Sequence, residues 1–198
     1  LLRARSRSDD FSTPSLLMPD NSGSTDVRYF AFGANMARRV LVGRRGIVPI
    51  ESSPARLDGY ALRFVLRGLP WLEPAFASLV EAPGEHMFGV LHTLSPRDMA
   101  RLDHVEMSYE RIAITVVTES GPVEATAYRA RRPSVERAPS RRYLQLLIEG
   151  ASEHGLPEAW IEGLRLRKVT HLRGISPMVE KVMMAGEQTL LRLRRPPR

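Results

Sequence analysis

Apolar and polar residues alternate through the middle of the chain in a pattern that predicts strands joined by tight turns. Residues 27–32 form a short aromatic and apolar run that stops at Gly33, which is typical of a buried strand. Residues 109–118 alternate in hydrophobicity, so one face of this strand is expected to pack on a core. Further strands are expected over residues 55–65, interrupted at Gly59, and over residues 76–80, 87–94 and 123–130, with turns at Pro83-Gly84 and Gly121-Pro122. Consecutive strands with tight turns favour an antiparallel or mixed sheet.

Apolar residues at helical spacing predict several helices. Asn35 is expected to cap a helix over residues 36–42. Ser95 fits the N-cap of a second helix, because Pro96 suits the first helical position and Asp98 the first turn. Two more helices are expected over residues 140–155, ended by Gly155, and over residues 157–166, opened by Pro157, and a short helical segment is expected over residues 178–184. The part of the chain after the strands is therefore predicted to be helical.

The two ends of the chain lack this patterning. Residues 1–26 are dominated by Ser, Thr, Asp, Pro and Gly and show no period, so we expect a disordered or weakly ordered N-terminal tail. Residues 170–198 are weakly patterned and are expected to form a C-terminal extension with an Arg-rich end. The expected organisation is one domain over residues 27–169 between two tails.

Composition excludes several kinds of chemistry. The chain has 198 residues, of which 43% are hydrophobic and 26% charged, as is typical of a globular domain. It has no cysteine, so disulfides, thiolate metal sites and a cysteine nucleophile are excluded. No apolar run is long enough for a membrane-spanning helix, so no membrane partner is expected. We expect a cytoplasmic protein.

The net charge of +7 raises the question of nucleic-acid binding, but the distribution of the charge argues against it as the main function. Seven of the 29 basic residues lie among the first seven and last seven positions, which hold no acidic residue. The other 184 residues carry 22 basic and 22 acidic groups and are therefore neutral. The excess charge belongs to the tails, where it would act as solvated, salt-sensitive charge. A nucleic-acid or acidic surface bound by these tails remains the third hypothesis.

The first candidate site is the turn at Gly33. A strand that runs through Phe32 and Gly33 into a helix near Asn35 exposes unpaired backbone N–H groups, which bind carboxylates and stabilise oxyanions. The same residues also fit an ordinary strand–helix turn with an Asn cap. The pattern is not GxGxxG and has no Walker lysine, so it does not predict a nucleotide site.

The second candidate site is the segment Asp103-His104-Val105-Glu106, which lies between a helix and a strand. These charges fit a solvated surface equally well. A glutamate packed among Tyr109, Phe88 and Met107 would instead suit a general base. His104 is a possible acid or base but fits a solvated helix position better. The five histidines show no metal-binding spacing, and no serine has a G-x-S-x-G setting, so neither a metal site nor a serine hydrolase is predicted.

Three blocks of the chain, in the right order, resemble the gamma-glutamyl cyclotransferase family. Residues 29–36, YFAFGANM, are similar to the YFAYGSNM-type signature that opens the family. Residues 76–114 match its run of strand, Pro-Gly turn, Trp/Phe-Gly-Val strand, helix, Leu-Asp-x-x-Glu block and following Tyr. Residues 138–157 resemble the segment that has a substrate-facing Tyr and a helix ending in Gly-Leu-Pro. The matching blocks span about residues 27–169.

The resemblance implies an α+β fold, a small mixed and mostly antiparallel β-barrel-like sheet with flanking helices. It also implies a reaction on a small-molecule gamma-glutamyl substrate, in which the substrate's own α-amine attacks its γ-carbonyl. That reaction releases 5-oxoproline and an amine or amino acid, and it needs no cofactor and no metal. The alternative hypothesis is a non-catalytic member of the same fold that binds a small molecule. The sequence leaves the leaving group and the oligomeric state open.

Carried over by position, the resemblance places the family's essential glutamate, the general acid and base, on Glu106. The Tyr that follows it falls on Tyr109, and the helical Tyr falls on Tyr143. The remaining residues expected to bind substrate are those of the loop and the strand leading into it: Tyr29, Phe30, Ala31, Phe32, Gly33, Ala34 and Asn35. Phe32 and Ala34 stand where the family signature has Tyr and Ser, so both positions lack a hydroxyl group, which puts the identity of the substrate in question.

Overall fold

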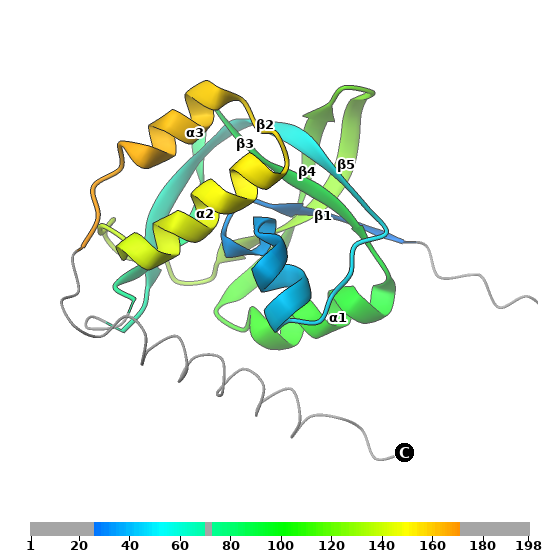
Figure 1. Cartoon of the computed structure of the whole chain (residues 1–198), viewed down its shortest axis with the longest axis horizontal. Helices are drawn as coiled ribbons and strands as arrows, with labels where there is room; N and C mark the ends of the chain where they lie inside the picture. Colours follow the sequence, from blue (N-terminus) through cyan, green and yellow to red (C-terminus); the bar gives the residue numbers. More distant parts are fainter. Residues whose placement is uncertain (1–25, 70–72, 171–198) are drawn as a thin grey trace, which may run out of the picture.

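The computed structural model describes residues 26–69 and 73–170, and in this part of the chain five strands close into a barrel flanked by helices (Figure 1). The strands are β1 (Val27–Ala31), β2 (Glu51–Arg67), β3 (Ala75–Leu94), β4 (Tyr109–Thr118) and β5 (Gly121–Ala130). The α-helices are α1 (Pro96–Val105), α2 (Arg141–Glu153) and α3 (Glu158–Arg165). A single 3₁₀ turn, η1 (Ala34–Met36), and a π-helix, η2 (Arg39–Arg44), connect β1 to β2.

The barrel has the strand order β1-β3-β2-β4-β5. β3 is antiparallel to both β1 and β2, and β4 is antiparallel to β2 and β5. The ring closes where β1 runs parallel to β5, at the pair Tyr29 and Thr126. The predicted α+β class, a mixed and mostly antiparallel barrel-like sheet with flanking helices, is therefore confirmed.

The prediction of two strands separated by a turn at Pro83-Gly84 is wrong, because β3 runs through this segment without reversing. Its register against β2 moves from Asp58 opposite His86 to Tyr60 opposite Glu81. Four residues of β3 therefore lie opposite Gly59 alone, which is a bulge in a bent pair of strands. Gly59 and Gly84 both have positive φ, +77° and +87°, so the residues that suggested a turn shape this bulge instead.

The prediction of a helix over residues 36–42 capped by Asn35 is also wrong. The chain forms η1 and then η2, and no side chain caps either of them. The Asn35 amide donates instead to Tyr29 and Glu106, so it is already engaged inside the protein. The predicted cap of α1 is confirmed, because Ser95 accepts a hydrogen bond from the Asp98 N–H at 3.1 Å. Ser140, the first residue of the helix expected over residues 140–155, is the N-cap of α2.

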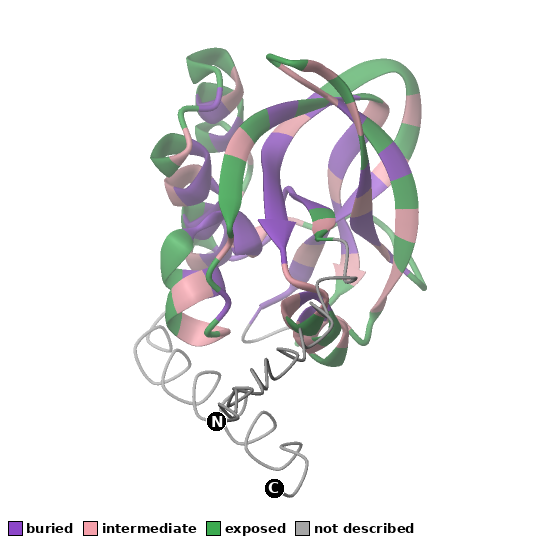
Figure 2. Ribbon diagram, turned by 90° about the vertical axis from the view of Figure 1, so that its right-hand side faces the viewer, coloured by how far each residue is buried: buried purple, intermediate pink, exposed green. Residues whose placement is uncertain are grey.

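The core lies between the barrel and helix α2. Figure 2 shows the buried residues concentrated along the strands and on the helix faces turned toward them. α2 packs against η1 and α3. Because η1 lies directly after β1, this packing fixes the loop that leaves the barrel. Within the described residues, no helix is both long and apolar enough to span a bilayer.

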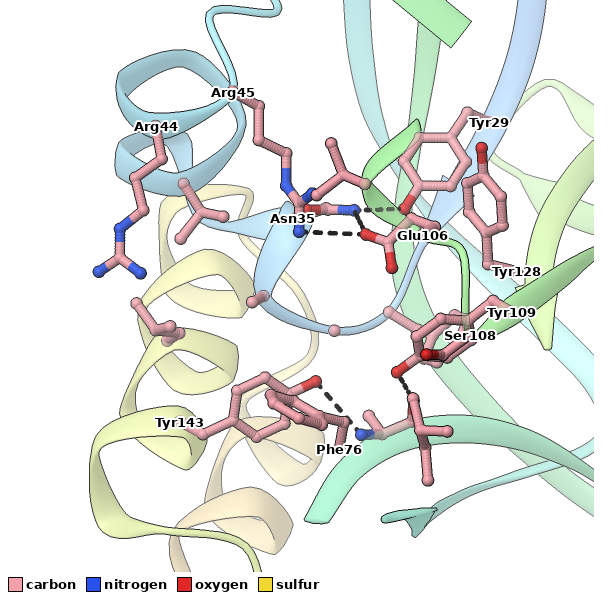
Figure 3. Close-up of a pocket in the computed structure, with 18 of the residues that line it drawn as sticks. Tyr29, Asn35, Arg44, Arg45, Phe76, Glu106, Ser108, Tyr109, Tyr128 and Tyr143 are labelled. Atoms are coloured by element: carbon pink, nitrogen blue, oxygen red, sulfur yellow. Dashed lines mark hydrogen bonds and ion pairs between the residues drawn. The ribbon is translucent and has the colours of Figure 1, made fainter. Parts of the chain in front are cut away.

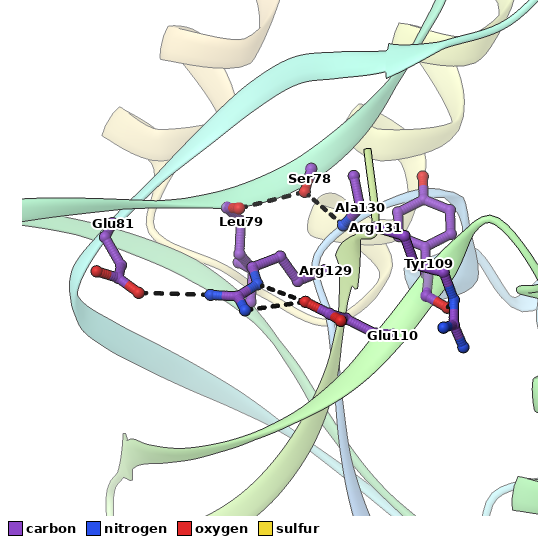
Figure 4. Close-up of polar contacts among 8 residues, drawn as sticks. All are labelled: Ser78, Leu79, Glu81, Tyr109, Glu110, Arg129, Ala130 and Arg131. Atoms are coloured by element: carbon purple, nitrogen blue, oxygen red, sulfur yellow. Dashed lines mark hydrogen bonds and ion pairs between the residues drawn. The ribbon is translucent and has the colours of Figure 1, made fainter. Parts of the chain in front are cut away.

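Polar contacts on the side of the barrel join β5 both to its neighbour β4 and to β3, which is not its neighbour in the sheet (Figure 4). The Ser78 hydroxyl of β3 accepts a hydrogen bond from the Ala130 N–H of β5 at 3.0 Å. Arg129 of β5 pairs with Glu110 of β4 at 2.9 Å and with Glu81 of β3 at 3.4 Å. These ion pairs are largely exposed, so they contribute little to stability, about 1 kcal/mol or less each.

The predicted tails over residues 1–26 and 170–198 and the helical segment predicted over residues 178–184 lie outside the described residues, except for the residues at 26 and 170. The limits of the domain, residues 27–169, stay a prediction.

A buried histidine makes stability depend on pH. His92 of β3 is 1% exposed, and its Nδ1 lies 2.7 Å from the Ser52 hydroxyl. Burial, with His154 nearby, lowers the pKa of His92 to about 4. In the unfolded chain a histidine takes up its proton near pH 6.5. The unfolded state therefore binds more protons than the folded state between about pH 6.5 and 4, and stability falls as pH decreases through this window.

We expect His92→Gln to lose less stability on acidification than the wild type. This one histidine accounts for a loss of about 2 kcal/mol between pH 7 and 4.5. Urea unfolding at pH 7 and at pH 4.5 measures this change in the free energy of unfolding. His86→Gln, at an exposed position, is the control, and we expect it to lose as much stability on acidification as the wild type. Equal pH dependence in the wild type and the His92 variant would contradict the assignment.

Candidate active site

A cavity of about 220 Å³ lies where segments distant in sequence meet (Figure 3). The end of β1 and the loop after it form one wall, and the turn between α1 and β4 and the first turn of α2 face this loop. The cavity is lined by eight of the residues predicted to form the site: Tyr29, Phe32, Gly33, Ala34, Asn35, Glu106, Tyr109 and Tyr143. The two candidate sites of the sequence are thus parts of one cavity.

Glu106 reaches the cavity from the end of α1. Its backbone N–H donates to the Leu102 carbonyl at 2.8 Å, and its carbonyl accepts from the Tyr109 N–H at 2.8 Å, so the helix end and the following turn fix the backbone. The side chain is 13% exposed. Arg45 Nη2 and Asn35 Nδ2 each lie 3.1 Å from Oε1. Because both of these partners contact Oε1, the other oxygen, Oε2, faces the cavity (Figure 3).

Asn35 connects the loop to both β1 and the glutamate. Its Nδ2 donates to the Tyr29 hydroxyl at 2.9 Å as well as to Glu106. The residue is only 6% exposed, and its Oδ1 has no partner among the described residues. An unpaired buried acceptor costs free energy, so this side chain is held in place by its two Nδ2 contacts and not by its oxygen.

Two tyrosines hold the opposite wall of the cavity at Ala77. The Tyr109 hydroxyl donates to the Ala77 carbonyl at 2.9 Å, and the Ala77 N–H donates to the Tyr143 hydroxyl oxygen at 3.2 Å. The Tyr143 hydroxyl therefore keeps its own proton for a further acceptor. A Cβ atom at Gly33 would lie 3.2 Å from the same hydroxyl oxygen, so glycine leaves room at this point.

The tyrosines of the cavity act as hydrogen-bonding groups and not as bases. Burial, supported by the nearby charge of Glu106, raises the pKa of Tyr29, Tyr109 and Tyr143 above that of an ordinary phenol. All three hydroxyls therefore stay protonated at neutral pH. Glu106 is then the group in this cluster that is able to accept a proton.

The loop after β1 has backbone N–H groups that are free to donate hydrogen bonds. The N–H groups of Gly33, Ala34 and Asn35 have no hydrogen-bond partner in the described part of the chain, because the first paired N–H of η1 is that of Met36. All three residues line the cavity. Unpaired N–H groups of this kind attract carboxylates and oxyanions.

Some residues lie elsewhere than the sequence suggested. Phe30 and Ala31 are fully buried in the core and are not among the described residues that line the cavity. The expected neighbours Phe88 and Met107 do not surround Glu106. Phe88 packs against Trp160 at 5.9 Å between ring centroids, and Met107 is 57% exposed, because the chain turns outward directly after α1.

Sequence reasoning missed Arg45, the residue that forms an ion pair with Glu106. It follows η2 in the basic pair Arg44-Arg45, and its side chain is 11% exposed beside Glu106. A basic pair near Gly46 is visible in the sequence, but nothing local connects it to an acid on another element. Ser108, Tyr128 and other lining residues were also not predicted.

His104 and Asp103 lie outside the cavity lining. His104 is exposed and its Nδ1 lies 2.7 Å from the Ala100 carbonyl, while Asp103 pairs with Arg111 and Tyr128. In the part of the chain that the structure describes, no three His, Asp or Glu side chains gather closely enough to hold a metal ion.

Comparison with known proteins finds a family and relatives of similar sequence. The model of the AIG2-like family matches residues 86–164. A gamma-glutamylcyclotransferase of Bos taurus is 28% identical over 188 residues, covering 84% of this chain and 97% of that protein. A gamma-glutamylcyclotransferase of Homo sapiens is 28% identical over 189 residues, covering 86% and 99%.

A solved structure described as a gamma-glutamyl cyclotransferase has the same fold. It superimposes with a TM-score of 0.69 and 24% sequence identity, covering 82% of this chain and all of that one. The curated relatives match over nearly their whole length, and the family model covers the part of the chain that contains Glu106. These comparisons support the resemblance of this chain to the gamma-glutamyl cyclotransferase family.

Proposed function

We propose that this protein is a cofactor-independent enzyme that cyclises a small gamma-glutamyl compound and releases 5-oxoproline together with an amine or amino acid. The proposal depends on one observation above all: Glu106 and the loop residues Gly33, Ala34 and Asn35, whose N–H groups have no partner among the described residues, line the same cavity. A base and a set of oxyanion donors in one cavity are what this reaction requires.

The first step is attack by the substrate's own α-amine on its γ-carbonyl. Glu106 accepts a proton from the amine as the nitrogen bonds to the carbonyl carbon. The carbonyl oxygen takes up negative charge, which the N–H groups of Gly33, Ala34 and Asn35 stabilise. The bond to the leaving nitrogen then breaks, and that nitrogen receives the proton held by Glu106.

The other polar groups hold the substrate in a folded conformation. A five-membered ring forms only when the amine and the carbonyl are brought together, and a narrow cavity achieves this by restricting rotation. The free proton of Tyr143 offers a hydrogen-bond donor to the glutamyl part of the substrate. We assign the same domain, residues 27–169, to this function.

Because Phe32 and Ala34 replace the usual Tyr and Ser, we expect the substrate to differ from that of an enzyme with those two hydroxyl groups. Both side chains line the cavity, so the missing hydroxyls make this wall apolar. The backbone donors of the loop are unaffected, and the reaction itself is retained in our proposal. The identity of the leaving group is where we expect this chain to differ.

The test is product analysis across a panel of gamma-glutamyl amino acids, gamma-glutamyl amines and glutathione. We expect 5-oxoproline and the leaving amine in equal amounts from at least one class of substrate. Tight binding without turnover for every compound would contradict the proposal and would favour a binding protein of the same fold.

A further inference from the structure

We propose that Arg45 is a positioning residue for Glu106, and that Arg101 on α1 holds Arg45 in place. Arg45 fixes Glu106 Oε1 so that Oε2 alone is presented to the substrate amine. This inference rests on the proposed cyclisation, because it assigns Arg45 a role through Glu106 and not through the substrate.

The ion pair between Arg45 and Glu106 is short and largely buried. Arg45 Nη2 lies 3.1 Å from Oε1, and both side chains are close to nine-tenths buried. The last torsion of a glutamate is broad, so a carboxylate without partners rotates freely. A charge-assisted bond from a rigid planar guanidinium, with Asn35 Nδ2 on the same oxygen, removes that freedom.

The backbone of Arg45 is tied to the helix that ends at Glu106. Arg101 Nη2 donates to the Arg45 carbonyl at 3.0 Å, and Arg101 Nη1 donates to the Gly46 carbonyl at 3.1 Å. Asp98, one turn earlier in α1, pairs with Arg101 at 3.3 Å. Because Arg101 lies in α1 and Glu106 is the residue that caps its C-terminus, the two residues that contact Arg45 are positioned by the same helix.

Gly46 is suited to this arrangement. Its φ is +63°, and a Cβ atom there would lie 3.2 Å from Arg101 Nη2. A side chain at this position would therefore be strained and would press on the guanidinium that holds the loop.

The buried atoms of Arg45 argue against a role as a direct substrate ligand. Nε and Nη1 are fully buried and have no hydrogen-bond partner among the described residues. A molecule in the cavity does not reach these atoms, and Nη2 is already committed to Glu106. The guanidinium is therefore placed to act on the glutamate.

The test compares kcat and KM for 5-oxoproline release. We expect Arg45→Met to lower kcat by about 100-fold with KM changed by less than about threefold, because a misplaced catalytic group costs rate and not ground-state binding. Arg45→Lys is expected to recover part of the loss, and Arg101→Ala to lower kcat by roughly tenfold in the same pattern. Arg63→Ala, which removes an exposed ion pair to Glu85 away from the cavity, is the control and keeps the wild-type constants.

A rise in KM with unchanged kcat would overturn the proposal, because it would make Arg45 a substrate ligand. Crystal structures of Arg45→Met and Arg101→Ala give a second readout that needs no activity. We expect the Glu106 carboxylate to leave its position in the first and to shift in the second; an unmoved carboxylate in both would also overturn the proposal. An inactive wild type would count against the proposed function, while these crystal structures would still decide the role of Arg45.

Discussion

Replacing Glu106 with glutamine is expected to lower 5-oxoproline release by about two orders of magnitude or more, the usual contribution of a general base. Glutamine has nearly the same shape, and its carbonyl oxygen still accepts hydrogen bonds from Arg45 and Asn35. It does not take a proton from the substrate amine. The loss is therefore expected in kcat, while the fold is retained.

The control is Glu110→Gln. Glu110 is a carboxylate on β4 that pairs with Arg129 on the side of the barrel and is not among the described residues that line the cavity (Figure 4). We expect its activity to stay close to that of the wild type. Near-normal turnover in Glu106→Gln, measured by the same 5-oxoproline assay, would remove Glu106 from the mechanism.

Substitution of Gly150 by alanine is expected to have the second large effect, on stability. Helix propensity favours the alanine, while steric overlap with the neighbouring backbone opposes it. Gly150 lies in α2, where alanine is favoured over glycine by about 1 kcal/mol from helix propensity alone. A Cβ atom at this position would lie 2.5 Å from the Ala37 N atom and 2.6 Å from the Met36 carbonyl carbon. These atoms belong to the backbone, which cannot move aside as a flexible side chain does.

We expect the cost of the steric overlap to exceed the gain in helix propensity. Overpacking of this kind costs about 1–3 kcal/mol, and it acts on the segment directly after Asn35. We therefore expect Gly150→Ala to lower the free energy of unfolding by up to about 2 kcal/mol after the helix-propensity gain. Activity is expected to fall as well, since α2 would displace the loop that carries the backbone donors.

Gly163→Ala is a matched control for this prediction. Gly163 is an exposed residue of α3, and a Cβ atom there would meet nothing within 4 Å. Only helix propensity acts at this position, so the variant is expected to be more stable by up to about 1 kcal/mol. Urea unfolding of both variants measures the difference, and equal stabilisation of the two would contradict the close packing of α2 on the loop.

Local signals predicted the elements whose causes are local. Ser95 with Pro96, and Ser140 before an amphipathic segment, each define a helix start within four residues, and both helices begin there. The alternating pattern of residues 109–118 predicts β4 with its exact bounds. Such features need no knowledge of the rest of the chain.

Elements that depend on distant partners were not predictable in the same way. Asn35 looks like a helix cap in sequence, but its amide is engaged by Tyr29 and Glu106, and Glu106 lies far along the chain. Pro83-Gly84 looks like a turn, but pairing with β2 on both sides of the bulge keeps β3 continuous. In each case the long-range contact overrides a local preference.

The candidate site shows the same limit. From spacing alone Glu106 fits a surface charge as well as it fits a base, and the family resemblance was needed to choose between them. Arg45 had no such signal, because an ion pair between two elements leaves no fixed spacing in the sequence. Its place beside Glu106 emerges only when α1 and the end of η2 are brought together.

Cyclisation by the substrate's own amine is tested most directly by running the reaction in ¹⁸O-labelled water and determining the masses of the products by mass spectrometry. Attack by the α-amine brings no oxygen from water into the product, so we expect unlabelled 5-oxoproline together with the free leaving amine. Glutamate carrying ¹⁸O would show that water is the nucleophile in the cavity of Glu106 and Gly33, and would contradict this account.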